Sequence, residues 1–364
     1  MINVDENIYL ERYAREISYL ADVKDNNIRN AFRIVPRSRF IPQRKDYMLA
    51  EIYSDDVIPL KISDGKLSSS SSQPSLMAYM LERAEISPGD NVLEIGTATG
   101  YDTAIISAIV GSKGRVTSIE YDEMLAGVAK DILRSNGYDN CLVISDDGGK
   151  GYPLNAPYDE IVVTVGIYDL TRELLKQLKE RGRIVAPFIY YCGESTPLFK
   201  LQRKGNILRG RFLLDSIFIH AKGRIGTPEY DIRKYMEKCK NEFGKKIVHA
   251  SSLSREVYNR DFLLYLSLTE DSAIFDGKVL YVLDDKYGLL QISKALVILY
   301  GDEVLLKRLE YAARRYKVNR IHFNNLELTL FPKGTSAEIK GDFIVKRKDF
   351  VHAFTSAPTS RGNA

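Results

Sequence analysis

The sequence predicts an α/β protein with a doubly wound, Rossmann-like core, followed by a smaller α+β domain. Short β-branched apolar runs alternate with helical patterns between about residues 87 and 187, which is typical of a parallel sheet covered by helices. The first run stops at a glycine-rich loop that opens a helix, as a buried parallel strand does. The 364 residues suit two domains at ~150 residues each, and the pattern changes near residue 222.

Each element of the core is predicted from a local pattern. Residues 28–35 have an amphipathic helical pattern that ends before Pro36, because the residue ahead of a proline resists the helical region. The serine run at residues 68–72 is predicted to be a loop. The expected strands are residues 91–95, 114–120, 141–145, 160–164 and 183–187. The expected helices between them are residues 102–110, 123–135 and 170–180.

The second half of the chain has weaker patterns. A helix is expected after Thr227, where a proline at the first helical position and one apolar stripe precede Gly244. Strands are expected at residues 262–268, 278–283 and 321–331, with a capped helix starting near Asp302. The predicted parts are a core at residues 1–222 (its helical N-terminal segment at 1–66), an accessory, substrate-recognition domain at 223–350 and a disordered tail at 351–364.

The composition argues against several classes of protein. Fifty-two Lys and Arg residues against 48 Asp and Glu leave a net charge of +4 spread along the chain, which is no nucleic-acid footprint. The apolar runs are far shorter than the ~20 residues of a membrane span, and the acidic N-terminus lacks signal-peptide features. Cys141, Cys192 and Cys239 are odd in number and far apart, so neither disulfides nor a metal site is expected. We expect a cytoplasmic protein without nucleic-acid or membrane partners, and its oligomeric state stays open.

The loop at residues 96–100 is the strongest chemical signal. Its glycines let a ligand approach the backbone, and the helix beyond it offers free N–H groups, although a tight strand-to-helix turn needs glycine for packing as well. Glu120 ends the next strand, where an acidic side chain is placed to accept both hydroxyls of a ribose, although exposed strand ends often carry glutamate. Together the two features indicate an adenosine-bearing cofactor.

The spacing within the loop favours one cofactor. The loop lacks the G-x-G-x-x-G order of dinucleotide-binding proteins. The spacing Glu-x-Gly-x-x-x-Gly, led by Glu94, fits the loop of S-adenosylmethionine-dependent methyltransferases better. Asp147 and Gly148, which follow the third strand, would then lie beside the adenine. The alternative for these two residues is a plain Asp-Gly turn.

Several segments, in the right order, resemble the protein-L-isoaspartate O-methyltransferase family. The resemblance covers roughly residues 25–220 and is carried by residues 31–42, 72–82, 88–101, 116–120, 137–140, 156–164 and 177–179. It implies methyl transfer from S-adenosyl-L-methionine to the carboxylate of an isoaspartyl residue in a peptide or protein. The implied cofactor-binding residues are Glu94, Gly96, Thr97, Ala98, Thr99, Gly100, Tyr101, Glu120, Tyr121, Asp147 and Gly148. The resemblance further implies that Ser72 is catalytic and that Gln73, Pro74, Ser75 and Thr164 contact substrate.

The absence of an obvious general base agrees with this chemistry. A carboxylate with a pKa near 4 is already ionised at pH 7, and a sulfonium is already a strong electrophile, so catalysis reduces to holding the reacting groups in line. Ser72 would orient the substrate carboxylate, whereas the alternative is one serine among several in a loop. Gln73, Ser75 and Ala98 depart from residues common in the family, which bears on substrate preference.

The C-terminal half leaves the substrate open. Residues 300–332 loosely resemble the extension of long-form members that modify ribosomal peptides of the lanthipeptide type, although this chain has no tryptophan. The substrate is therefore either isoaspartyl residues in damaged proteins or an aspartate in a dedicated peptide, each passing through a succinimide. Other classes to weigh are an RNA or small-molecule methyltransferase and a binding protein that has lost catalysis. Lys346, Arg347 and Lys348 are expected on a solvated face, with help in holding an acidic peptide as the alternative.

Overall fold

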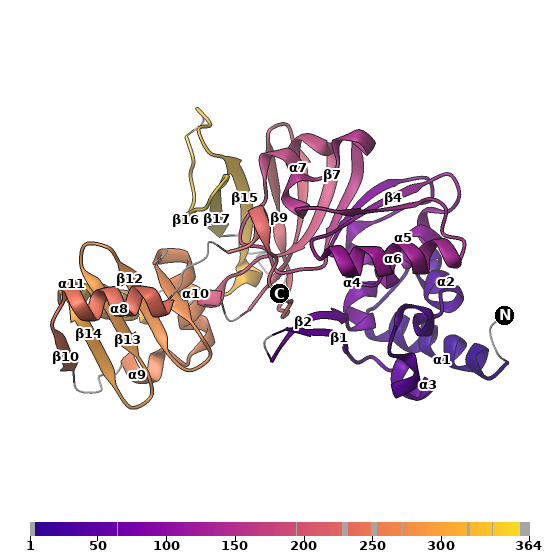
Figure 1. Ribbon diagram of the computed structural model, residues 1–364. Coiled ribbons are helices and arrows are strands. Elements are labelled where there is room, and N and C mark those ends of the chain that lie inside the picture. The colour runs from indigo at the N-terminus through magenta and orange to yellow at the C-terminus, as the bar shows by residue number, and fades with distance from the viewer. Residues whose placement is uncertain are drawn as a thin grey trace, which may run out of the picture.

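The computed structural model describes residues 4–63, 65–193, 195–227, 232–248, 253–270, 272–318, 321–336 and 338–356. A ten-stranded sheet forms the body of the molecule, and a five-stranded sheet forms a second unit beside it (Figure 1). The order in the large sheet is β16-β17-β15-β9-β8-β7-β6-β3-β4-β5. Its parallel strands are β3 (Asn91–Ile95), β4 (Arg115–Glu120), β5 (Cys141–Ser145), β6 (Tyr158–Val163) and β7 (Leu178–Pro187).

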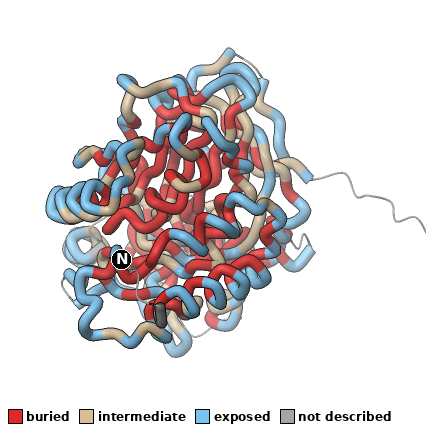
Figure 2. Tube along the Cα trace, turned by 90° about the vertical axis from the view of Figure 1, so that its right-hand side faces the viewer, coloured by how far each residue is buried: buried red, intermediate tan, exposed pale blue. Residues whose placement is uncertain are grey.

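Both faces of the parallel strands are covered, which confirms the predicted doubly wound core. Successive strand residues point to opposite faces, so Val92 packs into one core cluster and Leu93 into the other. The first face is covered by α1 (Val4–Leu20), α2 (Asn26–Ile34), α4 (Pro74–Ala84), α5 (Tyr101–Val110) and α6 (Glu123–Ser135). The second face meets α7 (Arg172–Gln177) and the C-terminal half of the chain. Figure 2 shows the buried residues concentrated in the strands between these layers.

A hairpin precedes α4 and replaces most of the expected serine loop. Strands β1 (Ile58–Ser63) and β2 (Lys66–Ser71) pair antiparallel, after the short helix α3 (Leu49–Ile52). Ser69 and Ser71 are buried, two residues apart, as side chains on one face of a strand are. Pairing with β1 satisfies the backbone of the serine run, which outweighs the preference of serine for loops.

The C-terminal strands return to the large sheet. Strand β8 (Leu198–Lys204) pairs antiparallel with β7, β9 (Ile207–Leu214) pairs antiparallel with β8, and β15 (Leu326–Pro332) then pairs with β9. β17 (Phe350–Ser356) pairs with β15 on one side and β16 (Phe343–Lys346) on the other. Residues 326–350 thus leave the expected accessory domain, and residues 351–356 form a strand where a disordered tail was expected, because Phe350 and Phe354 bury their rings against the sheet. The rest of that tail, residues 357–364, lies outside the described residues.

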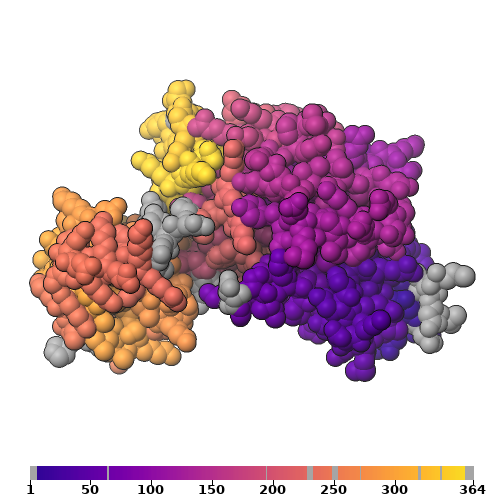
Figure 3. All heavy atoms as spheres, viewed as in Figure 1, coloured from indigo at the N-terminus to yellow at the C-terminus, as the bar shows by residue number. Residues whose placement is uncertain are grey.

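The five-stranded unit has the order β10-β14-β13-β12-β11 and carries helices against its sheet. Its strands are β10 (Lys245–Val248), β11 (Ala273–Phe275), β12 (Leu280–Asp284), β13 (Gly288–Ile292) and β14 (Val297–Gly301). Its helices are α8 (Ile232–Glu242), α9 (Leu253–Glu256), α10 (Arg260–Thr269) and α11 (Val304–Val318). Figure 3 shows this unit standing beside the body of the molecule. With the β15–β17 strands counted in the body, the predicted class of an α/β core with a smaller α+β domain is confirmed.

Two expected elements differ in type or length. The run at 262–268 is helix α10, not a strand, because Asn259 caps it and nearly all of its apolar side chains are buried, which removes the periodicity that separates the two structures. The helix expected at 170–180 ends at Gln177, where Leu178 begins β7. Among the described residues, none of the helices is long and apolar enough to cross a membrane.

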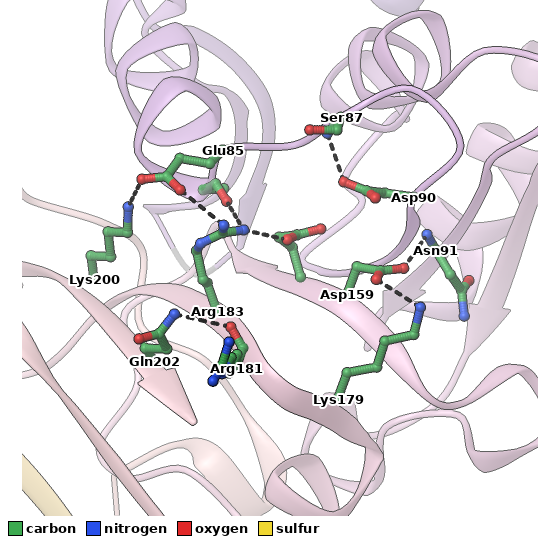
Figure 4. Close-up of polar contacts among 12 residues, drawn as sticks. Glu85, Ser87, Asp90, Asn91, Asp159, Lys179, Arg181, Arg183, Lys200 and Gln202 are labelled. Carbon is green, nitrogen blue, oxygen red and sulfur yellow. Dashed lines mark hydrogen bonds and ion pairs between the residues drawn. The ribbon is translucent and has the colours of Figure 1, made fainter. Parts of the chain in front are cut away.

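A polar network fastens the amino ends of the parallel strands (Figure 4). Arg183 on β7 donates to Glu160 on β6 at 2.7 Å and lies 2.9 Å from a carboxylate oxygen of Glu85, which also contacts Lys200. Burial raises the pKa of Glu160 to about 8, and Arg183 opposes that shift. Each of the four side chains is paired with another member of the network, so these residues stabilise this edge of the sheet. The opposite edge, where the parallel strands end, is left for a ligand.

Candidate active site

A cleft of about 940 Å³ opens at the carboxyl ends of β3, β4 and β6. It is lined by residues from the hairpin, the start of α4, the loop after β3, and the segment after β9. Of the site residues expected from the sequence, those that line it are Ser72, Gln73, Ser75, Gly96, Thr97, Ala98, Thr99, Tyr101, Glu120 and Thr164. The fold therefore gathers most of the expected catalytic, cofactor-binding and substrate-binding residues in one cavity.

The loop at residues 96–100 presents its backbone to the cleft. Gly96 has a φ of +107° and Gly100, the N-cap of α5, a φ of +90°, conformations that favour glycine. The threonine side chains point inward: Thr97 Oγ1 lies 2.6 Å from Ser118 Oγ, and Thr99 Oγ1 donates to the carbonyl of Phe40 at 2.6 Å. With its side chains tied down, the loop offers main-chain groups to a ligand.

Glu120 stands at the end of β4 beside this loop. Its Oε2 accepts from the Ala98 N–H at 2.8 Å, and its Oε1 accepts from the Asp122 N–H at 3.0 Å. Burial raises the pKa of this carboxyl, and the backbone N–H groups counter that shift by stabilising the anion. A carboxylate fixed at the strand end and open to the cleft has the acceptor character expected for binding ribose hydroxyls.

Six of the expected residues do not line the cleft. Glu94 is fully buried under the loop, Gly100 packs against Leu133, and Tyr121 is half exposed outside the cleft. Asp147 accepts from the N–H groups of Gly149 and Arg224, each at 2.9 Å, so it organises the turn that it begins. The remaining two are Pro74, buried at the first position of α4, and Gly148, where a side chain would clash with Ile95.

Glu94 belongs to a buried acidic pair with Asp102. Its Oε2 accepts from Thr103 and, at 2.5 Å, from Ser118, while Oε1 has no partner among the described side chains apart from the neighbouring carboxyl. Burial raises the pKa of Glu94 from 4.5 to about 7, and burial with the neighbouring Glu94 raises that of Asp102. The pair holds a proton at neutral pH and supports the loop from below.

This raised pKa predicts a pH-dependent stability. Between pH 4.5 and about 7 the unfolded chain has lost the Glu94 proton that the folded chain retains, so the free energy of unfolding falls as pH rises through that window. The shift corresponds to about 3 kcal/mol. Glu94→Gln is expected to reduce this fall, measured by urea unfolding at pH 5 and pH 8. Glu123→Gln, at an exposed helix start, is the control, and an unchanged fall in Glu94→Gln would contradict the prediction.

Two residues that sequence reasoning did not single out hold Ser72 in place. Arg37 is completely buried and donates to six acceptors. These acceptors are the backbone carbonyls of Ile52, Ser54, Asp56, Ser71 and Ser72 and the hydroxyl of Ser71. Asp55 accepts from the N–H of Ser75 at 2.7 Å, from its hydroxyl at 2.6 Å and from the Gln73 amide at 2.9 Å. Arg37 lies within the segment 31–42 that carried the resemblance, whereas Asp55 gave no signal in the sequence.

The hydroxyl of Ser72 is left free by this framework. The side chain is half-buried in the cleft and makes no hydrogen bond to any residue in the described part of the chain. Beyond it, the rim of the cleft is apolar and exposed at Val57, Leu67 and Ile217, the last of these 81 % exposed. Sequence reasoning missed this far wall, residues 214–219, because its mixture of apolar, serine and aspartate side chains has no chemical signature. The described residues contain no cluster of three or more His, Cys, Asp or Glu suited to a metal ion.

Comparison with known proteins agrees with the geometry of the cleft. Residues 15–225 match the family model described as protein-L-isoaspartate(D-aspartate) O-methyltransferase. The protein-L-isoaspartate O-methyltransferase of Thermotoga maritima is 38% identical over 202 residues, which span 56% of this chain and 63% of that protein.

Solved structures extend the likeness to most of the fold. A structure titled protein-L-isoaspartate O-methyltransferase has a TM-score of 0.60 and 27% identity, covering 95% of this chain and 100% of that one. A Plasmodium falciparum structure, titled a putative enzyme of the same kind in complex with S-adenosyl-L-homocysteine, shares the fold with 18% identity and a TM-score of 0.50, covering 58% of this chain and 98% of its own. The family model alone spans more than half of the sequence. The chain belongs to the protein-L-isoaspartate O-methyltransferase family.

Proposed function

We propose that this chain is an S-adenosyl-L-methionine-dependent O-methyltransferase that esterifies the carboxylate of isoaspartyl residues in proteins or peptides. The observation that carries the proposal is that one cleft holds a glycine loop and Glu120 at the strand ends together with the free hydroxyl of Ser72. The first two features suit an adenosine-bearing cofactor, and the third suits a substrate carboxylate.

The residues of the loop fit the cofactor. A Cβ on Gly96 would lie 2.5 Å from Thr164 Oγ1, so glycine keeps the loop close to the strand ends and open above. In this proposal Glu120 accepts the ribose hydroxyls, and the 96–100 backbone faces the remainder of the cofactor. The bound cofactor supplies an electrophilic methyl group on a sulfonium. Asp147 and Gly148 shape the neighbouring turn, and their proposed place is beside the adenine.

The protein then has little chemistry of its own to perform. The substrate carboxylate is ionised at neutral pH, and one of its oxygens forms the new bond to the methyl carbon while the bond to sulfur breaks. Ser72 donates a hydrogen bond that orients the carboxylate, and Arg37 and Asp55 hold the backbone from which Ser72 projects. The methyl ester is subsequently attacked by the following backbone nitrogen, which releases methanol and leaves a succinimide.

The rim of the cleft suits a polypeptide substrate. Exposed apolar side chains at Val57, Leu67 and Ile217 offer contacts to residues that flank the target. The names of the relatives favour isoaspartyl residues in proteins as the substrate, and an aspartate in a dedicated ribosomal peptide is the alternative that the same assay tests. In this proposal, the part of the accessory domain that forms the five-stranded unit recognises substrate.

A serine substitution tests the proposed reaction. Ser72→Ala is expected to lower kcat on a short isoaspartyl peptide about 10- to 100-fold, because a hydrogen bond to a charged group is lost. Labelled methyl transfer measures this effect, and calorimetry is expected to show unchanged cofactor affinity. Ser63→Ala, in the same hairpin but outside the cleft, is the control. Equal transfer by Ser72→Ala and wild type would remove Ser72 from the reaction, and equal transfer to the aspartyl twin peptide would contradict isoaspartyl selectivity.

A further inference from the structure

A second cavity of about 560 Å³, the junction cavity, lies where the five-stranded unit meets the body of the molecule. Its wall on the body includes Tyr168, Tyr190 and Arg347, and its wall on the five-stranded unit includes Tyr235, Glu270 and Asp284. The cavity is thus lined by aromatic rings and by ionisable groups of both signs. Pockets of this size accommodate ligands larger than a single ion.

Arg347 is a buried cation in this cavity without an ionic partner. It is 5 % exposed, and its guanidinium lies 4.2 Å from the ring centre of Tyr168 and 4.4 Å from that of Tyr190. Nη1 donates to the Tyr168 carbonyl and Nη2 to the Ile189 carbonyl, whereas Nε donates to no described residue. No carboxylate within the described chain forms an ion pair with Arg347. A buried arginine with spare donors is costly unless an anion accompanies it.

The acidic groups of the cavity, in contrast, are already neutralised. Glu270 and Asp284 are both bound by Arg308, and Asp285 lies 3.6 Å from Lys238. Arg347 is therefore the one fixed ion among the described lining residues that lacks a counter-ion. One unpaired cation compensates one negative charge and not the several charges of a nucleotide. The balance selects a ligand with a single carboxylate and an apolar or amide-bearing body.

The walls around Arg347 are held rigidly. Tyr190 OH lies 2.6 Å from Nδ1 of the buried His352, whose Nε2 lies 3.0 Å from Asp169. The next two residues, Tyr191 and Cys192, have φ values of +53° and +57°, a conformation that non-glycine residues rarely adopt. Such strain persists only where the surroundings impose it and is concentrated at functional sites. The aromatic sandwich that holds Arg347 is thus preorganised.

The junction cavity and the active-site cleft are lined in part by the same extended segment, residues 219–221. Gly166 pairs with the 219–221 segment, donating to the Ile219 carbonyl and accepting from the Ala221 N–H, each at 2.8 Å. Ile219 lines the active-site cleft, whereas the next residue, His220, lines the junction cavity, as neighbouring side chains of an extended segment do. The two cavities are therefore lined by adjacent residues of one extended segment.

We propose that the junction cavity binds a carboxylate of the polypeptide substrate, an acidic side chain or the terminal carboxylate, and that Arg347 is its partner. The inference rests on the proposed function, because it takes the occupant to be the polypeptide methylated in the neighbouring cleft. It assigns a recognition role to the 346–348 segment, in which Lys346 and Lys348 are exposed and Arg347 alone is buried. In this proposal the enzyme prefers substrates that carry a carboxylate at a fixed distance from the isoaspartyl residue over substrates that lack it.

Peptides with one movable glutamate test this site. The set consists of isoaspartyl peptides in which a glutamate, or a glutamine in its twin, is placed about three to eight residues to either side of the target, a reach of ~10–27 Å for an extended chain. At one spacing the glutamate peptide is expected to have a KM about tenfold lower than its twin, with kcat unchanged. Arg347→Met is expected to abolish that difference, whereas Lys346→Met, on the exposed neighbour, preserves it.

Two further measurements keep the test decisive. Thr227→Trp places a large side chain at the exposed edge of the cavity and is expected to reproduce the effect of Arg347→Met without removing a buried group. Calorimetry with N-acetyl-L-phenylalanine and its amide, which carries no carboxylate, tests the small-molecule source of the same chemistry. If N-acetyl-L-phenylalanine binds in an Arg347-dependent manner, its amide does not, and no peptide shows a spacing effect, the cavity is a site for a small carboxylate and the proposed peptide occupant is wrong.

Failure of the site differs from failure of the proposed function. If methyl transfer is absent but the glutamate-bearing isoaspartyl peptides bind in an Arg347-dependent manner by calorimetry, the site stands while the proposed reaction is wrong. If transfer occurs but no peptide spacing and no carboxylate probe responds to Arg347→Met or Thr227→Trp, the junction site is overturned. A spacing effect that survives both substitutions overturns it as well.

Discussion

Replacing Arg37 with methionine is expected to lower the free energy of unfolding by about 3–5 kcal/mol. The guanidinium has no exposed surface, and its removal leaves five buried or half-buried carbonyls without their donor. Two of those carbonyls belong to Ser71 and Ser72, so the segment that carries the proposed catalytic hydroxyl loses its support. We therefore expect kcat for methyl transfer to fall by about 100-fold or more in the molecules that remain folded.

The neighbouring residue Arg39 provides a matched control. It is exposed on the same short 3-10 helix, Arg37–Phe40, and donates to Asn136 at 3.1 Å, so Arg39→Met is expected to change stability little. Arg37→Lys keeps the charge but not the planar set of donors, and is expected to fall between wild type and Arg37→Met. Urea unfolding and single-turnover transfer measure the two effects. If Arg37→Met lost stability while its kcat and cofactor affinity both stayed at the wild-type level, Arg37 would not be a positioning residue.

The parts of the site that could be predicted from the sequence are those whose chemistry demands a residue type at a fixed place. The 96–100 loop and Glu120 stand at strand ends, and a strand end is visible in the sequence as the point where an apolar run stops. The contacts of Arg37 could not be predicted, because five of its six acceptors are backbone carbonyls from two separate segments, residues 52–56 and 71–72, and carbonyls have no sequence signature. A motif records where a residue occurs but not which way its side chain points. Glu94 was therefore expected to contact the cofactor, whereas its side chain is buried under the loop.

The differences in the fold have a similar cause. The serine run is a strand and the 262–268 run is a helix because pairing with β1 and burial on all sides decided the outcome, and both depend on tertiary contacts. Residues 326–356 return to the large sheet, although more than a hundred residues separate β15 from its partner β9. Local pattern carries no information about such a distant pairing. Arg347 likewise looks solvated between two lysines, and only the fold buries it.

Gly96→Ala is expected to lower the rate of methyl transfer to about 1% of the wild-type rate or less, because the loop cannot keep its shape with a side chain at residue 96. Gly96 has a φ of +107°, and a Cβ would lie 2.5 Å from Thr164 Oγ1 and 3.0 Å from a methyl carbon of Val165. The same Thr164 hydroxyl donates to the Gly96 carbonyl at 2.7 Å. A methyl group at residue 96 therefore pushes the loop off the strand ends and into the space proposed for the cofactor, so calorimetry should show a cofactor affinity at least about tenfold weaker.

A second glycine separates backbone strain from this clash. Gly89 has a φ of +92° and no atom within 4 Å of its would-be Cβ, so Gly89→Ala is expected to lose only the ~1–2 kcal/mol of a left-handed alanine. If the clash with Thr164 is the cause, Thr164→Ala combined with Gly96→Ala restores part of the lost cofactor affinity, and the double-mutant cycle gives a favourable coupling. Equal losses of cofactor affinity in Gly96→Ala and Gly89→Ala would instead attribute the effect to general destabilisation. The affinity difference between the two variants thus measures how closely the loop must approach the strand ends to bind the cofactor.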